Sequence, residues 1–158
     1  MGASQQQLQE LSQQLQEIEE QIQVLRSEVE NVRDEQDAVD EATDAIEQLE
    51  TGSTVQVPLG GGAYVRATID DIDEIIVELG ADYAIERDQD GAAETLEHKK
   101  DRLGDRIDDL EEEITDLESE SGQLEQQAQQ LQQQAMQQQM QQMQGQGQGP
   151  GSDQGLDE

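Results

Sequence analysis

The 158-residue sequence contains no cysteine, phenylalanine or tryptophan, and only one histidine and two tyrosines. Without cysteine the chain cannot form disulfide bonds or use a thiolate nucleophile. Its single histidine, His98, leaves no His-rich metal site and no Ser-His-Asp relay. Because aromatic residues are so scarce and only 32% of the residues are apolar, we do not expect a single compact globule.

Positive charge is scarce as well. Against 39 Asp and Glu residues there are only 8 Lys and Arg residues, so the formal net charge is −31. This charge repels nucleic-acid phosphates and anionic lipid head groups, so we expect neither nucleic acid nor membrane as a partner. No apolar run approaches the ~20 residues that span a bilayer, and the N-terminus carries no recognisable secretion signal, which predicts a cytoplasmic protein. Charge and hydropathy alone favour disorder, and the periodicity of the apolar residues tests that interpretation.

Apolar residues recur in residues 5–50 with the alternating spacing of three and four that is typical of a coiled coil. The stripe continues through Gln36 and Val39, slips in phase near Ala42, and ends at Leu49. We therefore predict a first coiled-coil helix over residues 5–50. Its regular part consists of Leu8, Leu11, Leu15, Ile18, Ile22, Leu25, Val29 and Val32.

A second stripe of the same kind predicts another coiled-coil helix over residues 90–143. Leucines recur every seven residues, and the alternate core position changes from isoleucine to small residues towards the C-terminus. The leucines are Leu96, Leu103, Leu110, Leu117, Leu124 and Leu131, and the alternate residues are Ile107, Ile114, Ser121, Ala128 and Ala135. We therefore expect looser packing near the C-terminal end of this helix. The Gly- and Gln-rich residues 144–158 are predicted to form a disordered tail.

Two helices of similar length with a short segment between them should fold back as an antiparallel pair. In that arrangement Leu8 lies near Ala135 or Met136, and Leu49 lies near Leu96.

Residues 53–87 show the two-residue alternation of β-strands instead. Turn signals at Gly60-Gly61-Gly62 and Gly80-Ala81-Asp82 divide them into two successive β-hairpins, with Pro58 at an edge or a bulge. Two hairpins cannot bury a stable core alone. We therefore predict that this segment assembles with other subunits through Val55, Val57, Leu59, Tyr64, Val65, Ile69, Ile75, Val77, Leu79, Tyr83 and Ile85.

Two parts of this central segment carry a specific resemblance. The first combines Val57-Pro58-Leu59-Gly60 with Gly62-Ala63-Tyr64-Val65, and the second is Val77-Glu78-Leu79-Gly80-Ala81-Asp82-Tyr83-Ala84-Ile85-Glu86. Set between two heptad helices, they make residues 5–140 similar to the α type of the archaeal prefoldin family. Two hairpins match the α type, because the β type has one. Heptads alone would be weak grounds, since many unrelated proteins have them.

The resemblance implies an α+β fold. In it, a long antiparallel coiled-coil hairpin of two helices is joined by a small two-hairpin β segment that assembles into an oligomeric β-barrel platform. It further implies a hexamer of two α and four β prefoldin subunits, which captures unfolded polypeptides at the coiled-coil tips without ATP. The hexamer would deliver these clients to a group II chaperonin, with no cofactor and no enzymatic activity. A structural coiled-coil oligomer that acts as a spacer or tether is the alternative.

The resemblance places the client contacts of this chain at the tip where both helices end. The residues are Leu8, Leu11, Leu15, Leu131, Ala135, Met136, Met140 and Met143. Loose packing would expose them, and methionine suits promiscuous apolar contact. The leucines could instead complete the coiled-coil seam, and both roles can coexist. The three methionines could equally belong to a disordered tail.

The acidity calls for an explanation of its own. Only two lysines occur, Lys99 and Lys100, and acidic side chains crowd together in residues 108–113. At ~1 M salt the Debye length is about 3 Å, so the repulsion between such charges is largely screened. We therefore predict adaptation to a salt-rich cytosol, as in a halophilic archaeon. A generic acidic, solvated face is the alternative.

The remaining chemical patterns are weak. Residues 86–97 match the spacing of an EF-hand loop, but Glu stands at position 1 and a strand precedes it. We therefore predict no metal site and interpret Asp90 as the cap of the second helix. The acidic residues 70–74 have no nucleophile or oxyanion donor nearby, which predicts a solvated turn. His98 is predicted at the surface, and no catalytic residue is assigned.

Overall fold

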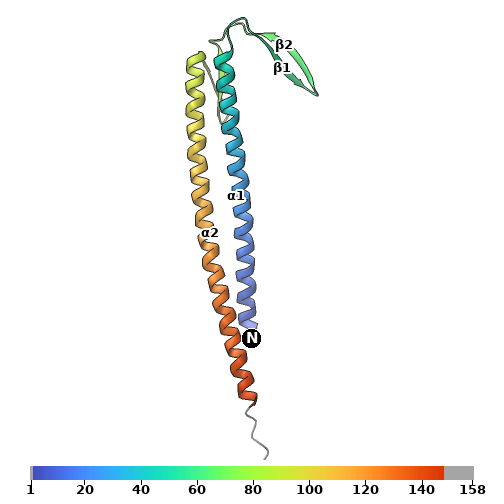
Figure 1. The fold of residues 1–158 in the computed structure, drawn as a ribbon, viewed down its shortest axis with the longest axis vertical. Helices are drawn as coiled ribbons and strands as arrows, with labels where there is room; N and C mark the ends of the chain where they lie inside the picture. The colour runs from blue at the N-terminus through green and yellow to red at the C-terminus, as the bar shows by residue number, and fades with distance from the viewer. Residues whose placement is uncertain (1, 148–158) are drawn as a thin grey trace, which may run out of the picture. The chain divides into compact units, whose positions relative to one another are not determined.

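The computed structural model describes residues 2–147. A helix, two β-hairpins and a second helix follow one another along the chain, which confirms the predicted α+β class (Figure 1). The second helix extends four residues beyond its predicted end at residue 143, and the rest of the predicted tail, residues 148–158, lies outside the described residues. The elements are α1 (Gly2–Gln48), β1 (Thr54–Gly60), β2 (Ala63–Thr68), β3 (Ile75–Gly80), β4 (Tyr83–Arg87) and α2 (Gln89–Gly147).

The chain falls into two compact units. The terminal unit combines the residues up to Leu25 with those from Glu113 onward, and the central unit is Arg26–Glu112. Each unit contains one segment of α1 and one of α2, and the central unit also contains both hairpins. Neither helix is long and apolar enough in its described part to cross a membrane.

In the terminal unit, the coiled-coil seam residues of α1 are more deeply buried than those of α2. From α1, Leu11, Ile18 and Ile22 are buried. From α2, the seam residues beyond Ile114 are only half-buried: Leu117, Ser121, Leu124, Ala128, Leu131 and Ala135. Serine and alanine are too short to fill a coiled-coil core layer. The half-burial is therefore what the weakening stripe predicts.

The core of the central unit joins the helices to the second hairpin. Val39 of α1, Val77 of β3, and Ala92 and Leu96 of α2 form a buried cluster, and Val77 is only 5% exposed. The α1 stripe slips in phase near Ala42 because α1 packs against β3 there as well as against α2. The residues that pack against the cluster are Ala42, Ile46, Ile75, Leu79 and Leu103.

Part of the predicted assembly surface contributes to this core. The sequence predicts Ile75, Val77 and Leu79 as assembly residues, but their side chains pack within their own chain. A helix pair beside the hairpin supplies the buried face that the hairpin lacks alone. These three residues therefore have a structural role.

The junction between the helices is fixed by polar contacts. Asp88 Oδ1 accepts a hydrogen bond of 2.7 Å from the backbone N–H of Gly91, so Asp88 caps α2 and the prediction of Asp90 as the cap is wrong. The side-chain amide of Gln89 donates to the carbonyls of Ile46, at 2.7 Å, and Leu49, at 3.0 Å. Leu49 therefore lies beside Gln89, and the prediction that it lies near Leu96 is wrong.

Both hairpins are antiparallel and turn through two residues. In the first, Val57 pairs with Val65, and the register shifts between Pro58 and Gly60, which confirms the predicted irregularity at Pro58. In the second, Val77 pairs with Ile85. The two residues of the second turn, Ala81 and Asp82, have φ of 50° and 61° without being glycine.

Candidate functional site

The ends of α1 and α2 in the terminal unit form a groove of about 360 Å³, here called the tip groove. Leu8 from α1 meets Ala135 and Met136 from α2 along it, as the antiparallel arrangement predicts. Leu8 and Ala135 are half-buried, whereas Met136 is 69% exposed. The polar residues of the lining are Ser4, Gln5, Gln132, Gln138, Gln139 and Gln142. The groove thus offers apolar side chains to solvent among uncharged polar ones.

The other predicted tip residues divide between seam and surface. Leu11 and Leu131 line a second groove of about 450 Å³, where Leu11 is buried and Leu131 is half-buried. Leu15 is half-buried as well. Met140 and Met143 are exposed and belong to α2, not to a tail. The helix therefore holds the methionines in defined positions.

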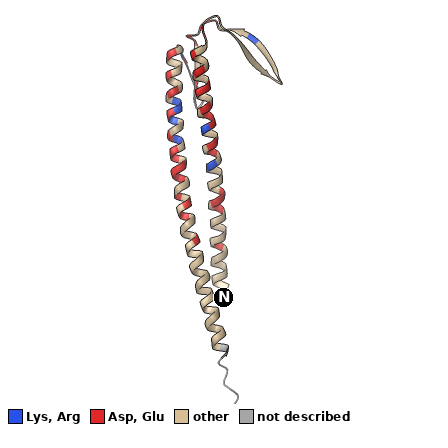
Figure 2. Cartoon of the chain, in the orientation of Figure 1, with Lys and Arg blue, Asp and Glu red and all other residues tan. Residues whose placement is uncertain are grey.

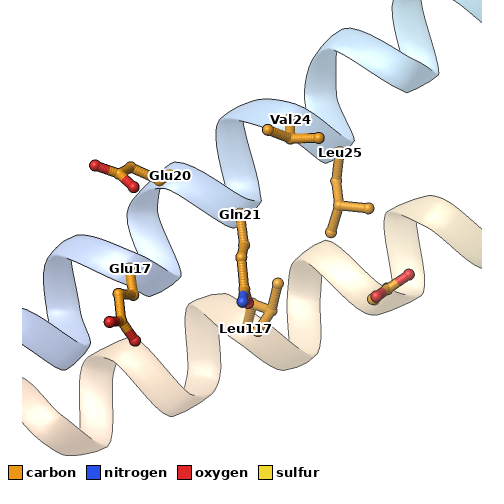
Figure 3. Close-up of a pocket in the computed structure, with 7 residues that line it drawn as sticks. Glu17, Glu20, Gln21, Val24, Leu25 and Leu117 are labelled. Carbon is orange, nitrogen blue, oxygen red and sulfur yellow. The ribbon is translucent and has the colours of Figure 1, made fainter.

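A third groove of the terminal unit, of about 530 Å³, was not predicted from the sequence. Leu25 of α1 and Leu117 of α2 extend towards each other there, next to Val24, which is 66% exposed (Figure 3). Glu17, Glu20, Gln21 and Glu113 complete its lining. Val24 lies off the heptad stripe, so periodicity alone misses it. The adjacent apolar pair Val24-Leu25 is the signal in the sequence that could have found it.

Charge is distributed very unevenly over the two units. All eight basic residues belong to the central unit: Arg26, Arg33, Arg66, Arg87, Lys99, Lys100, Arg102 and Arg106. Every charge of the terminal unit is therefore negative. Figure 2 shows that even acidic residues are missing from the stretch of α2 that approaches its C-terminal end. In the sequence, residues 126–145 and residues 2–9 contain no charged side chain.

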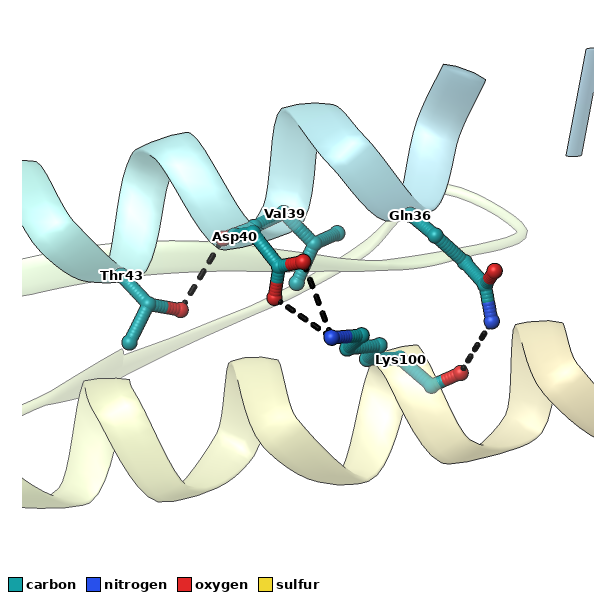
Figure 4. A network of polar contacts seen from close by, with 5 residues as sticks. All are labelled: Gln36, Val39, Asp40, Thr43 and Lys100. Atoms are coloured by element: carbon teal, nitrogen blue, oxygen red, sulfur yellow. Dashed lines mark hydrogen bonds and ion pairs between the residues drawn. The ribbon is translucent and has the colours of Figure 1, made fainter. Parts of the chain in front are cut away.

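In the central unit, ion pairs connect the two helices. Arg33 Nη2 lies 2.9 Å from Glu111 Oε1, Lys100 Nζ lies 2.8 Å from Asp40 Oδ1, and Arg106 pairs with Glu28. The hydrogen bond from Lys100 to Asp40 (Figure 4), together with the nearby Asp37 and Asp101, raises the pKa of Lys100. Each pair is partly exposed to solvent, so water and salt screen its attraction and it adds little to stability.

A polar residue of the α1 seam also has a defined partner. Gln36 Nε2 donates to the backbone carbonyl of Lys100 at 3.2 Å (Figure 4). Gly104, on the next turn of α2, borders this contact: a Cβ added there would lie 3.4 Å from Gln36 Nε2, an ordinary contact distance. A satisfied polar group at a seam position can fix the register of a helix pair.

The first hairpin exposes several apolar side chains of the central unit. Val57, Leu59, Tyr64 and Val65 are exposed, Leu59 to 68%, while Val55 and Ile69 are half-buried. The sheet has two strands, so both of its edges are open to pairing with another chain.

The second hairpin also has exposed apolar residues. Tyr83 is 73% exposed, and Ile85 is half-buried. Ile76, 72% exposed, was not predicted because it alternates with Glu74 and Glu78 and reads as part of a polar face. We call the exposed apolar residues of both hairpins the assembly surface: Val57, Leu59, Tyr64, Val65, Ile76 and Tyr83.

The weaker chemical patterns form no site. Residues 86–97 are not a loop, because β4 runs to Arg87 and α2 starts at Gln89. Asp71 and Asp73 belong to the turn between the hairpins, where Asp71 Oδ1 accepts a hydrogen bond of 3.0 Å from the Asp73 backbone. His98 is exposed, 3.8 Å from Glu94 Oε1. Within residues 2–147, no three His, Asp or Glu side chains are grouped to hold a metal ion.

Comparison with known proteins gives a consistent result. The family model described as "Prefoldin subunit" matches residues 18–134. A prefoldin subunit alpha from Halorubrum lacusprofundi is 59% identical over 69% of this chain and 72% of that protein. A prefoldin subunit alpha from Halobacterium salinarum is 61% identical over 68% of this chain and 70% of that protein.

One further relative matches a smaller part of the chain, and one solved structure has a lower sequence identity. The prefoldin subunit alpha of Haloarcula marismortui is 65% identical, but over only 40% of this chain and 41% of that protein. A solved structure of filamentous PFD from Methanocaldococcus jannaschii shares 21% identity, with a TM-score of 0.49, over 75% of this chain and 95% of that one. The three sequence relatives named here all come from halophilic archaea.

Proposed function

The chain belongs to the prefoldin family of chaperone subunits, and on this premise we propose that it captures unfolded polypeptides, without ATP, at the tip groove. We further propose that it works in the cytoplasm in a hexamer of two α and four β subunits. The hexamer passes its clients to a group II chaperonin. No catalytic step is involved.

The capture step is supported by one observation above all. Met136, Met140 and Met143 are exposed on an ordered helix, next to a groove that contains Leu8 and Ala135. Methionine adapts its shape to many apolar partners and suits a surface that must accept many sequences. Several such surfaces in one complex would strengthen weak binding through avidity.

Assembly is supported by the assembly surface. An isolated two-stranded sheet is marginally stable in water, and Val57, Leu59, Tyr64 and Val65 of the first hairpin are exposed. Pairing with hairpins of other subunits would bury these side chains and close the open edges. Native mass spectrometry with and without a β subunit tests the stoichiometry. A complex without β subunits, or a ratio other than two to four, would contradict it.

The experiment for capture compares variants of the assembled complex. Met136, Met140 and Met143 are replaced together by glutamine, which has a similar helix propensity. Burying one methionine fully contributes about 1.5–3 kcal/mol, so losing a third of the burial of all three should weaken capture about tenfold or more. Aggregation of an unfolded client without ATP is the readout, and Val24→Gln, an exposed aliphatic residue outside the tip groove, is the control.

The outcome separates the chaperone from a spacer or tether. Loss of suppression in the methionine variant but not in Val24→Gln supports capture at the tip groove. If the unaltered complex fails to suppress aggregation, the capture function is wrong, and a structural role remains. Transfer of a fluorescent client from the complex to a group II chaperonin tests delivery separately.

A further inference from the structure

The tip groove is uncharged although it belongs to a chain of net charge −31. Nearly a third of all residues are charged, yet residues 2–9 and 126–145, which supply the whole lining, include none. The nearest acidic residues along the chain are Glu10 and Glu125. The polar part of the lining consists of one serine and five glutamines.

This composition has a chemical consequence for the occupant. A glutamine amide donates two hydrogen bonds and also accepts through its carbonyl oxygen, whereas an ionised glutamate at the same position only accepts them and adds a negative charge. The groove can therefore donate to carboxylates and backbone carbonyls without repelling a negative chain. A basic occupant would bind more favourably beside acidic side chains. The terminal unit has such side chains elsewhere, for example Glu17, Glu20 and Glu113 around the third groove.

We propose that the tip groove takes acidic unfolded segments, and that its glutamines are the feature that admits them to a strongly negative protein. The exposed Met136 contacts the apolar side chains of such a segment, while Gln132, Gln139 and Gln142 donate to its carboxylates. This inference rests on the proposed capture function and specifies the class of client.

The test uses one unfolded chain in two charge states. Fluorescently labelled lysozyme, reduced and carboxamidomethylated so that it stays unfolded, is basic, and succinylation of its lysines makes it acidic. Both forms are titrated with the assembled complex, at the lowest salt concentration at which circular dichroism shows the complex folded. Binding is followed by fluorescence anisotropy.

Two triple variants change only the charge of the groove. One carries Gln132→Glu, Gln139→Glu and Gln142→Glu, and the other carries lysine at the same three positions. The control carries Gln129→Glu, Gln133→Glu and Gln137→Glu, which make the same change of charge on α2 outside the lining of the groove.

For the acidic form, we expect the glutamate variant to bind at least tenfold more weakly, and the lysine variant to bind as well as the unaltered complex or more tightly. The control should stay within about threefold. Equal weakening by glutamate and lysine, for both forms, would overturn the inference but leave capture intact, because the groove would then simply exclude charge. If the unaltered complex bound only the basic form, the inference would also be overturned. Binding of neither form would overturn the capture function together with it.

Discussion

Gly122 of α2 offers a sharp test of how the terminal unit is held together. It lies in the middle of a helix, where glycine is about 1 kcal/mol less favourable than alanine. A Cβ added at Gly122 would have no neighbouring atom within 4 Å. Gly122→Ala should therefore gain the whole difference in helix propensity, with no packing penalty and no new contact.

Gly104 and Gly91 of α2 provide matched comparisons, because a Cβ added at either position would have neighbouring atoms within 4 Å. At Gly104 the new Cβ would lie at an ordinary contact distance, 3.4 Å from Gln36 Nε2, so most of the gain should remain. At Gly91 it would lie 2.5 Å from Asp88 Oδ1, the atom that caps α2. Because a cap contributes about 1 kcal/mol, its disturbance should cancel the gain. The expected order of stabilisation is Gly122→Ala, then Gly104→Ala, then Gly91→Ala.

Hydrogen exchange of backbone amides, measured for the full chain at high salt, gives the readout. A local gain of about 1 kcal/mol corresponds to roughly fivefold slower exchange. For Gly122→Ala this slowing should be confined to the terminal unit. If exchange around residue 122 stayed unchanged or became faster, the helix would not have the open surroundings described for this position. If Gly91→Ala gave the largest gain, Asp88 would not be the cap.

Three further predictions follow from the central unit and from the charges. Asp88→Ala should lower the free energy of unfolding by about 1 kcal/mol and Asp90→Ala by about 0.5 kcal/mol or less, and equal losses in thermal unfolding would contradict the assignment of the cap. Val77→Ala should cost about 2 kcal/mol because it removes two buried carbons and leaves a cavity. Val57→Ala should change the free energy of unfolding by less than about 0.5 kcal/mol but weaken assembly in sedimentation experiments. If Val57→Ala instead lowered stability and Val77→Ala weakened assembly alone, the first hairpin would not be the one that binds other subunits. Lowering the salt from ~1 M to ~0.01 M lengthens the Debye length from about 3 to about 30 Å, so the terminal unit, which has no basic residue, should lose exchange protection before the ion-paired central unit; full protection without salt would argue against adaptation to a salt-rich cytosol.

The sequence predicts the elements well because each has an unambiguous period. Heptads identify both helices, two-residue alternation identifies the strands, and glycines identify the first turn. The second turn is formed by Ala81 and Asp82 in left-handed conformations. Its position is predicted by Ala81 and Asp82 together with the preceding Gly80, which also has a positive φ, of 96°.

Tertiary contacts are where prediction from the sequence fails. Val55 and Val77 occur in similar alternating patterns, but one lies on an exposed hairpin and the other in a buried cluster with Leu96. Periodicity reports that a side chain needs a partner and does not say whether that partner is in the same chain. The phase slip at Ala42 is a visible trace of the contact with β3, but interpreting it requires knowing which element lies there.

The sequence predicts only those residues of the candidate site that follow the periodic pattern. The antiparallel pairing brings Leu8 to Met136 as expected. The exposed Val24 and Ile76 escape prediction because each lies off the periodic stripe or alternates with acidic residues. The uncharged lining of the tip groove becomes evident only when both helix ends are seen together.

Photo-crosslinking of the assembled complex shows directly whether unfolded clients bind at the tip groove. Benzoylphenylalanine replaces Met136, Val24 or Val57 in three separate preparations, each of which is irradiated in the presence of a labelled unfolded client. We expect client adducts at position 136, few at position 24, and adducts to neighbouring subunits at position 57. Client adducts mainly at position 57, with none at position 136, would contradict capture at the tip groove.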